Sequence, residues 1–502
     1  MRIKLKVLLF LSFLSFQSIA QRLVLPGDYP DPSVVKIGDT YWATATTSNW
    51  LPAFPLLKSS DLINWHSVGN IFTEKPDWAD YYFWAPEISY ENGKVYVYYT
   101  AHKKDGNLCV GVASADKPEG PYKDHGPLIC QKDGSIDGFP MRDESGKLYL
   151  IWKEDGNSVG RPTPIWIQEM NEERTALLGE KKELFRNDAP WEGNLVEGVS
   201  MMRHGKYIYA FYAAGACCGR ECKYKTGIAR AERLLGPWEK YEKNPIAVDN
   251  ETWMCSGHGT PVEKAGKFYY MYHAYNSRSN VYIGRQGMLV EFRFTPDGWI
   301  EFVKEKSPSG NYLETVRDQF NAGSLSENWQ WSVFQPAGKE IRNGRLVLNA
   351  LPSNSGAFLG QKTYQMHYDV NVTLFTRRSH AASGIGLIGD DENTISALVK
   401  NDSIKIVRVR GNKETVLMKK FYPVKNRAHL KMQVRNGKDI SFLISRNGKK
   451  YAILNEIPVD GDFLPPWDRA LRVGLVAKGG RGQKSVFDNF YLKNISGASK
   501  ND

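Results

Sequence analysis

The chain has 502 residues, of which 42% are hydrophobic and 24% charged, and its net charge is +11. A chain of this length exceeds one ordinary hydrophobic core, so we expect two domains of unequal size. Lys and Arg residues are scattered along the sequence instead of forming a basic helix or arm, so the charge does not indicate a nucleic-acid partner. An acidic polysaccharide partner, or solubility alone, explains the charge equally well.

The first 20 residues have the pattern of an export signal. Arg2, Lys4 and Lys6 precede an apolar run over 7–16, and small residues at 18–20 form a cleavage site. The run is too short to span a bilayer, and no later segment is long and apolar enough to do so. We therefore expect a soluble, exported protein, periplasmic or secreted, without membrane insertion.

A sequence repeat organises about the next 290 residues. It has five copies, each of about the length of one propeller blade. Each copy has a Gly, a polar residue and an alternating strand rich in aromatic residues, and the copies begin at Gly38, Gly93, Gly146, Gly205 and Gly266. Their separations suit one four-stranded antiparallel sheet per copy. Helical periodicity of useful length is absent. The pattern predicts an all-β fold, with a five-bladed β-propeller over residues 21–310.

Ionisable residues precede each repeated hairpin. They are Asp31, Glu87, Asp137, Glu197 and His258. The first strand of each propeller blade lines the central channel, so these five residues should converge there. Burying such a ring is costly unless its members are paired, bound to a metal or functional. We therefore interpret the ring as the candidate site.

Each carboxylate of the ring also has a simpler interpretation. Asp31 lies between Pro30 and Pro32, which restrict the backbone, but a turn Asp that caps a loop fits the same motif. Glu197 lies in an apolar strand, where burial raises a carboxyl pKa and suits a general acid; a buried structural ion pair would have the same sequence. Asp137 has similar apolar neighbours.

Together the carboxylates match the chemistry of an inverting glycosidase. Such enzymes use one carboxylate to activate water and one carboxylic acid to protonate the departing oxygen, about 6.5–9.5 Å apart. Different blades around one channel can supply that separation. A third carboxylate near the acid would raise its pKa and hold its orientation, and Asp137 fits this role.

Five tracts carry a resemblance to a known family. The segments Tyr-Pro-Asp-Pro-Ser at 29–33, Trp-Ala-Pro-Glu-Ile at 84–88, Ile-Asp at 136–137, Val-Glu-Gly at 196–198 and Gly-His-Gly at 257–259 resemble glycoside hydrolase family 43. They cover most of the first 310 residues in the right order. The resemblance implies that Asp31 is the base, Asp137 the pKa modulator and Glu197 the acid.

The resemblance also implies further site residues. Trp84, Glu87 and Arg285 would bind the sugar, and His258 would face the channel near a bound calcium or sodium ion; no organic cofactor is implied. A hydrogen-bonded core histidine is the alternative for His258, and packing between blades is the alternative for Trp84.

The sequence departs from the family pattern at two positions. Gly138 and Val199 replace prolines that are common after the modulator Asp and after the Glu-Gly pair, which changes the walls near the reacting sugar. Glu192 has a local pattern similar to that of Glu197. We favour Glu197 because it directly precedes the fourth repeated hairpin.

A second β pattern follows a linker at 306–311. Asn-Gly hairpin signals recur at 343–344, 436–437 and 447–448, so we expect a β-sandwich over residues 316–495. The segments 318–320 and 487–490 should be its first and last strands and should meet. The region resembles the jelly-roll domain of family 43 β-xylosidases. Trp329 and Trp331 are interpreted as sandwich core in preference to a sugar platform.

The chain has six cysteines, too few for a disulfide scaffold in a protein of this size. Cys217, Cys218 and Cys222 form a cluster whose spacing is not that of a zinc site. A disulfide within the cluster stays open, and we do not expect a catalytic Cys.

The resemblance implies an exo-acting, inverting hydrolase that releases terminal arabinofuranosyl or xylosyl units from a plant polysaccharide. A sandwich that leans over the propeller would close one side of the site and favour exo action. The alternatives are a noncatalytic glycan-binding propeller, an exo-galactanase-type enzyme and a retaining, fructosidase-type propeller glycosidase. The sequence does not determine the sugar, the metal, the cysteine pairing or the oligomeric state.

Overall fold

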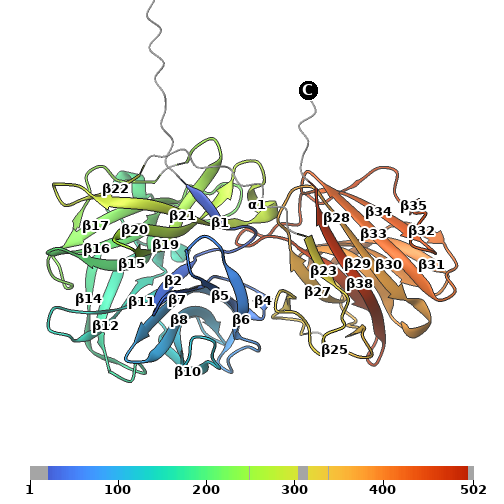
Figure 1. Ribbon diagram of the computed structural model, residues 1–502, viewed down its shortest axis with the longest axis horizontal. Helices are drawn as coiled ribbons and strands as arrows, with labels where there is room; N and C mark the ends of the chain where they lie inside the picture. Colours follow the sequence, from blue (N-terminus) through green and yellow to red (C-terminus); the bar gives the residue numbers. More distant parts are fainter. Residues whose placement is uncertain (1–20, 248, 304–314, 337, 496–502) are drawn as a thin grey trace, which may run out of the picture.

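The computed structural model describes residues 21–247, 249–303, 315–336 and 338–495 (Figure 1). The predicted export signal and linker lie outside these residues. The described chain is all-β, as predicted, and its helices are single turns: η1 (Gly156–Val159), η2 (Pro190–Glu192), α1 (Asn280–Ile283) and η3 (Thr376–Arg378). None of the helices in the described ranges has the length and apolar character that crossing a bilayer requires.

Described residues between 21 and 303 form five antiparallel sheets, each built around four strands. The first three sheets follow the chain order. The first contains β2 (Ser33–Ile37), β3 (Thr40–Thr44), β5 (Ala53–Ser59) and β6 (His66–Phe72). The second contains β7 (Ala79–Glu91), β8 (Lys94–Lys103), β9 (Leu108–Ala115) and β10 (Lys123–Ile129). The third contains β11 (Ser135–Arg142), β12 (Leu148–Glu154), β13 (Ile165–Met170) and β14 (Leu177–Phe185).

The last of the five sheets joins the two ends of this region. The fourth sheet contains β15 (Val196–His204), β16 (Tyr207–Ala214), β17 (Lys225–Ala231) and β18 (Glu239–Lys240). The fifth contains β19 (Trp253–Lys264), β20 (Lys267–Asn276), β21 (Arg285–Phe294) and β22 (Ile300–Phe302), with the N-terminal β1 (Arg22–Leu25) paired to β21.

The repeated glycines lie at the turn between the first and second strands of each sheet. Gly38, Gly93, Gly146, Gly205 and Gly266 all have positive φ angles, between 58° and 88°, which only glycine adopts without strain. Aromatic and β-branched residues follow each glycine and favour extended backbone. The hairpins predicted from the repeat are therefore confirmed.

The first strands of the five sheets are neighbours in a ring. β2 contacts β7, β7 contacts β11, β11 contacts β15, β15 contacts β19, and β19 contacts β2. Register shifts interrupt β7, β11, β15 and β19 close to the ionisable residue of each strand. Bulges of this kind re-aim side chains and are frequent beside active sites. Four of the five candidate residues therefore lie at local irregularities of their strands.

Described residues from 315 to 495 form two facing sheets. The larger contains β23 (Thr315–Asp318), β25 (Lys339–Ile341), β26 (Leu346–Asn349), β28 (Tyr368–Phe375), β33 (Arg427–Arg435), β34 (Asp439–Ser445), β35 (Ala452–Ile453), β36 (Val459–Asp460) and β38 (Lys484–Asn494). The smaller contains β27 (Ala357–Lys362), β29 (Ala382–Asp390), β30 (Asn393–Lys400), β31 (Ser403–Arg410), β32 (Lys413–Phe421) and β37 (Arg472–Lys478).

One apolar core fills the space between these two sheets. Trp329 is fully buried in it and contacts the rings of Phe320 and Phe490, so the interpretation of this residue as core is confirmed. β23 pairs with β38, and Asp318 lies opposite Phe490, so the first and last strands of the region meet as predicted.

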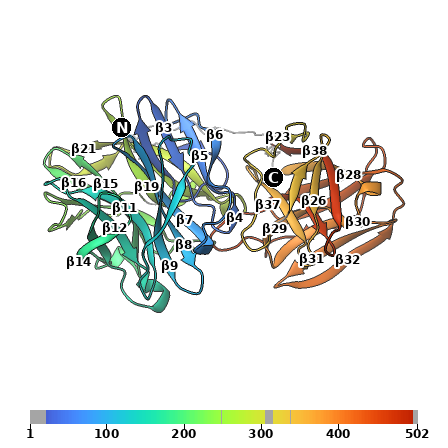
Figure 2. The same ribbon diagram turned by 90° about the horizontal axis from the view of Figure 1, so that it is seen from below.

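The two units lie side by side and share backbone pairing (Figures 1 and 2). β4 (Trp50–Leu51) from the first unit pairs with β24 (Trp331–Ser332), so Trp331 belongs to the contact between them. Arg472 of β37 forms a buried ion pair with Asp28 at 3.1 Å. Asp28 lies three residues before Asp31, so the second unit contacts the chain segment that carries a predicted catalytic residue.

Candidate active site

Asp31 is held by groups from three other segments. The carboxylate accepts hydrogen bonds from Thr46 Oγ1 at 2.7 Å and from the Arg285 guanidinium at 3.0 Å. The backbone N–H of Asp31 donates to Nδ1 of His273 at 3.1 Å, and the residue has a φ of 50°. Proline on either side restricts the backbone further. Asp31 is therefore fixed in position, as its sequence motif predicts.

The charges around Asp31 keep it ionised. Burial acts to raise the pKa of this carboxyl, but the guanidinium of Arg285 and the imidazoles of His258 and His273 outweigh burial and hold the pKa well below its ordinary value. Burial and the positive charge of Arg285 lower the pKa of His273 to about 4, although Asp31 opposes them. Asp31 is thus an anion near neutral pH.

Asp137 lies on β11 and is hydrogen-bonded to the strand that carries Glu197. Its Oδ2 accepts the backbone N–H of Gly198 at 2.9 Å, and its own N–H donates to Thr100 Oγ1 at 3.1 Å. Gly198 has a φ of 60°, and a Cβ there would lie 2.7 Å from the ring of His258. Glycine suits this position because a side chain would be strained at this φ and would clash with His258, so β11, β15 and β19 can approach closely here.

Glu197 lies on β15 between a lysine and a tyrosine. Lys153 donates from its ammonium group to Oε2 at 2.6 Å, and the hydroxyl of Tyr224 donates to Oε1 at 2.8 Å. Lys153 also binds Asp155 at 2.7 Å. Each oxygen of the Glu197 carboxylate thus accepts a hydrogen bond, and the two donors fix its orientation.

The pKa of Glu197 is lowered, whereas the sequence predicted that it would be raised. Burial acts to raise the pKa of Glu197, but Lys153 and Tyr224 outweigh it and lower that pKa. Burial and the charge of Glu197 raise the pKa of Asp137 to about 6, against the opposing effect of His258 and Lys153. The expectation of a raised Glu197 pKa was wrong, because Lys153 lies beside this carboxyl; the alternative of a buried ion pair describes its surroundings better.

The three carboxylates act on common neighbours. Burial and the charges of Glu197, Asp137 and Asp31 together raise the pKa of the Tyr224 phenol. The imidazole of His258 acts electrostatically on all three carboxylates. The structure therefore brings the three predicted catalytic residues together around Tyr224 and His258.

His258 lies inside this ring, as predicted, on β19. Its Nδ1 is 3.6 Å from Asp31 Oδ1, and its φ is 44°. Among residues 21–247, 249–303, 315–336 and 338–495, no three or more His, Cys, Asp or Glu side chains form a group that could hold a metal ion. The predicted calcium or sodium ion near His258 therefore stays a prediction, and the proposed reaction assigns no step to it.

Glu87 lies on β7 with hydroxyl partners. Burial raises its pKa to about 8, while hydrogen bonds with Ser33 and Thr260 act against burial. Thr260 Oγ1 lies 3.3 Å from Oε2. Glu87 therefore has the surroundings of a neutral carboxyl within the ring, and its predicted contact with sugar stays a prediction.

Trp84 lies on β7 and contacts the second unit. Its Nε1 donates to Ser48 Oγ at 3.1 Å and to Asp468 Oδ2 at 3.3 Å. Its ring stacks on Tyr82 with centroids 4.2 Å apart and meets the edge of Trp467 at 5.9 Å. Trp467 is 51% exposed. Trp84 thus belongs to an aromatic group shared by both units, which neither of its two sequence interpretations included.

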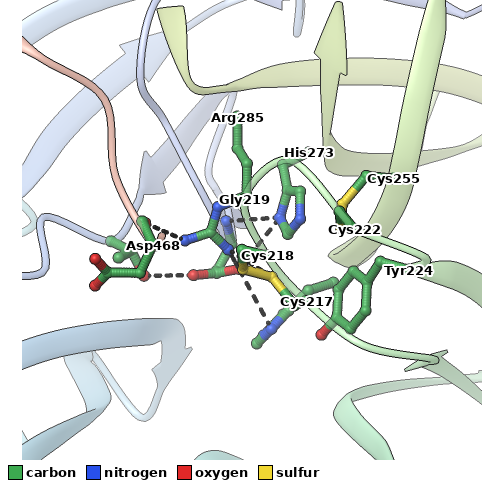
Figure 3. Close-up of a disulfide and its surroundings, with 12 residues drawn as sticks. Cys217, Cys218, Gly219, Cys222, Tyr224, Cys255, His273, Arg285 and Asp468 are labelled. Carbon is green, nitrogen blue, oxygen red and sulfur yellow. Dashed lines mark hydrogen bonds and ion pairs between the residues drawn. A yellow bond between two sulfur atoms is a disulfide. The ribbon is translucent and has the colours of Figure 1, made fainter. Parts of the chain in front are cut away.

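Arg285 begins β21 and joins Asp31 to the second unit. Besides its bond to Asp31, it donates to the backbone carbonyl of Asp468 at 2.9 Å. Figure 3 shows Arg285 between Asp468 and His273. Arg285 therefore lies beside Asp31, and its predicted contact with the sugar stays a prediction.

Sequence reasoning missed five contributors to the site: Thr46, Lys153, Tyr224, His273 and Asp468. Lys153 and His273 each directly follow a run of apolar residues in a strand, and this position was a signal available in the sequence. In the structure both are almost fully buried. Asp468 lies in the sandwich region, and its sequence carried no sign of a contact with the first unit.

Glu192, the alternative to Glu197, has a structural role. It is fully buried, accepts from the Tyr212 hydroxyl at 2.8 Å and pairs with Lys240 at 2.8 Å. The choice of Glu197 is therefore supported by the contacts of both residues.

The cysteines form three disulfides. Cys217 pairs with its neighbour Cys218, so the cluster does contain a disulfide, while Cys222 pairs with Cys255. The third disulfide joins Cys109 to Cys130.

Known proteins resemble the chain over both units. The family model described as glycosyl hydrolases family 43 matches residues 20–300, and the model described as the beta xylosidase C-terminal concanavalin A-like domain matches residues 317–465. The chain is 29% identical over 274 residues to a xylan 1,3-beta-xylosidase of Vibrio sp, a match that covers 50% of this chain and 49% of that protein. It is 25% identical over 365 residues to xylosidase/arabinosidase 43B of Humicola insolens, which covers 65% of each chain. The chain thus spans about half to two thirds of the length of these curated relatives.

Solved structures share the fold. A family 43 protein of Bacillus licheniformis has a TM-score of 0.80 and 24% identity, covering 94% of this chain and 99% of that one. A xylan beta-1,4-xylosidase of Bacillus halodurans has a TM-score of 0.80 and 21% identity, with the same coverage. Because the family model matches more than half of its residues, the chain belongs to glycosyl hydrolases family 43.

Proposed function

We propose that this protein is an exo-acting, inverting glycoside hydrolase with Asp31 as base and Glu197 as acid. The observation that carries the proposal is the grouping of Asp31, Asp137 and Glu197 around His258 and Tyr224, with a different fixed environment for each carboxyl. Two carboxyl groups with different environments are what acid and base roles require.

In the proposed reaction, Asp31 takes a proton from a water molecule as the water oxygen attacks the anomeric carbon. Glu197 gives its proton to the glycosidic oxygen, the bond between that oxygen and the anomeric carbon breaks, and the sugar leaves with inverted configuration. Arg285, His273 and Thr46 hold Asp31 as an anion in the required orientation. Asp31 can therefore accept the proton without first losing one.

Protonation of Glu197 needs the neighbouring carboxyl. In the free protein, Lys153 lowers the pKa of Glu197 and Glu197 raises that of Asp137, so the pair shares the uptake of one proton. A sugar that excludes water would strengthen the effect of burial on Glu197 and favour its protonated form. Asp137 is thus the modulator of the acid.

Arabinofuranosyl or xylosyl units at the ends of a plant polysaccharide are the proposed substrate. The relatives in the comparison are named xylosidases and arabinosidases, which supports this class of sugar. The segment with Trp467 and Asp468 reaches Trp84 and Arg285 from the second unit. A chain passing through the site would meet this segment, so cleavage at chain ends is favoured.

We also infer the arrangement that carries the site. The ring of contacts among β2, β7, β11, β15 and β19 supports a closed five-bladed β-propeller followed by a sandwich. Pairing of β1 with β21 would close the ring by joining the two ends of the propeller region. The basic and apolar pattern of the first 20 residues supports export to the periplasm or the exterior.

Aryl glycosides and polymers test the function. The protein is given aryl α-L-arabinofuranoside, β-D-xyloside and β-D-galactoside, and then arabinan, xylan and galactan. Release of monosaccharide alone supports exo action, whereas oligosaccharide ladders contradict it. Proton NMR of the first product should show the inverted anomer; the retained anomer would contradict the water-activating role of Asp31. Binding of these sugars without turnover would identify a glycan-binding protein instead.

A further inference from the structure

The loop between β16 and β17 carries two of the three disulfides at one place. Cys217 and Cys218 are bonded to each other, and Cys222 is bonded to Cys255 on β19 (Figure 3). The N–H of Gly219 donates to the Tyr275 hydroxyl at 3.2 Å, which attaches the same loop to β20. The loop is thus closed on itself and fastened to the fifth sheet.

The Cys217 end of the loop contacts the partner of the proposed base. Nη1 of Arg285 lies 3.6 Å from Cys217 Sγ, and the same nitrogen donates to Asp31 at 3.0 Å. Arg285 is 4% exposed, and its second terminal nitrogen donates to the backbone of Asp468. The sulfur therefore lies against the same terminal nitrogen that binds Asp31.

The other end of the loop contacts the proposed acid. The hydroxyl of Tyr224 donates to Glu197, and the ring of Tyr224 stacks on His273 at 5.7 Å. Cys217, Cys222, Tyr224 and Cys255 belong to a single apolar cluster. Displacement of this cluster would therefore disturb Tyr224, which binds Glu197, and Arg285, which binds Asp31.

A disulfide sulfur suits the position beside Arg285 because it carries no proton that can dissociate. It is also a weak hydrogen-bond acceptor, so it packs against the guanidinium without competing for its charge. A free thiol beside a guanidinium ionises more easily, and the resulting thiolate would attract the positive charge away from Asp31.

We propose that the Cys217–Cys218 disulfide is a positioning element of the reaction, which fixes Arg285 against Asp31 by keeping an uncharged sulfur and a closed turn beside the guanidinium. This inference rests on the proposed hydrolase function. It assigns the disulfide no contact with the reacting atoms.

The test compares oxidised and reduced protein on an aryl glycoside that the oxidised wild type turns over. Alkylation and mass spectrometry establish which disulfides a phosphine reductant has opened, and thermal unfolding establishes that the fold persists. Opening of Cys217–Cys218 should lower kcat by up to about 100-fold, the effect of displacing a catalytic group by roughly 1 Å. KM should change less, because Arg285 acts on the base.

Variants separate this disulfide from the other two. Cys217→Ala/Cys218→Ala should have the lowered kcat without reductant and show no further loss with it. Cys218→Ala keeps a sulfur beside Arg285 as a free thiol and should also have a lowered kcat. Cys109→Ala/Cys130→Ala removes the disulfide that joins β9 to the segment directly after β10, and should match the wild type before and after reduction.

Three outcomes would overturn the inference. The first is an unchanged kcat after confirmed opening of Cys217–Cys218, and the second is a wild-type kcat in folded Cys217→Ala/Cys218→Ala. The third is a further loss of kcat when that variant is reduced. The last outcome would assign the effect to Cys222–Cys255. Absence of turnover by the oxidised wild type on every substrate would instead contradict the proposed function, so the two failures are distinguishable.

Discussion

Lys153 binds Glu197 through a 2.6 Å hydrogen bond from a side chain that is 1% exposed. This pair places a buried cation against the carboxyl that the sequence identifies as the acid. Removal of one partner of a buried pair leaves the other charge uncompensated. The protonation of Glu197 is therefore set by burial, Lys153 and Tyr224 together, and not by burial alone.

Lys153→Met should move the alkaline limb of the profile of kcat/KM against pH upward. Loss of the cation raises the pKa of Glu197, by about 1–3 units for a partner at this range. Because the acid acts in its protonated form, activity should then persist to higher pH. Lys147→Met is the matched control, since Lys147 lies on the same hairpin and pairs with Glu169 at 3.0 Å on the surface. An unchanged alkaline limb would contradict the role of Lys153.

Asp31→Asn should lower kcat by about 10²–10⁴-fold, because the amide cannot take the proton of the attacking water. The measurement is kcat on an aryl glycoside, with circular dichroism to establish folding. Glu192→Gln is the contrasting variant: it disturbs the buried pair with Lys240, so its melting temperature should fall while kcat is kept. Comparable loss of kcat in both variants would mean that the effect of Asp31→Asn is structural.

Trp467→Ala should raise KM roughly tenfold with a smaller change in kcat. The ring is half exposed and meets Trp84 edge-on, so its loss removes stacking surface and loosens the neighbouring ring. Steady-state kinetics on aryl glycosides and on oligosaccharides of increasing length provides the measurement. Ile457→Ala, an exposed position of the same unit, serves as control. Equal KM values in Trp467→Ala and wild type would exclude the ring from substrate binding.

Glu87→Gln should reduce the loss of stability as the pH rises. The folded pKa of Glu87 is about 8 and its ordinary value is 4.5, so the stability gained by burying the protonated form is complete below pH 4.5 and is lost as the pH rises through 8. The amide stays neutral throughout. Between pH 5 and 9 the melting temperature of the wild type should therefore fall more than that of the variant, by roughly 2 °C or more.

The control for this prediction is Glu301→Gln, which replaces an exposed carboxylate paired with Arg293 on the surface. Its melting temperature should follow that of the wild type across the same pH range. Parallel curves for wild type and Glu87→Gln would show that Glu87 is ionised in the folded protein.

The ring of ionisable residues was predictable because its signal is local. Each member precedes a Gly-led hairpin, and the strand pattern of each repeat is complete within about 60 residues. The approach of first and last strands in the second unit was predictable for a similar reason, since both segments carry a recognisable Asp and Phe pattern. Such local patterns can be recognised without knowing how the two units pack together.

The partners of the carboxylates were not predictable in this way. Arg285 reaches Asp31 across 254 positions of sequence, and Asp468 reaches Trp84 across 384. The pKa of Glu197 depends on Lys153, which comes from the neighbouring sheet. Electrostatic energies depend on distance in space and on burial, neither of which a local pattern contains.

By itself, the sequence determined the all-β class, the repeated hairpins and the identity of the five ring residues, because alternation and turn chemistry act over a few residues. Only the tertiary structure decided which carboxyl is held as an anion, which one takes up a proton near pH 6, and which loop of the second unit reaches the site. Those properties arise from charges and hydrogen bonds that folding brings together from distant parts of the chain.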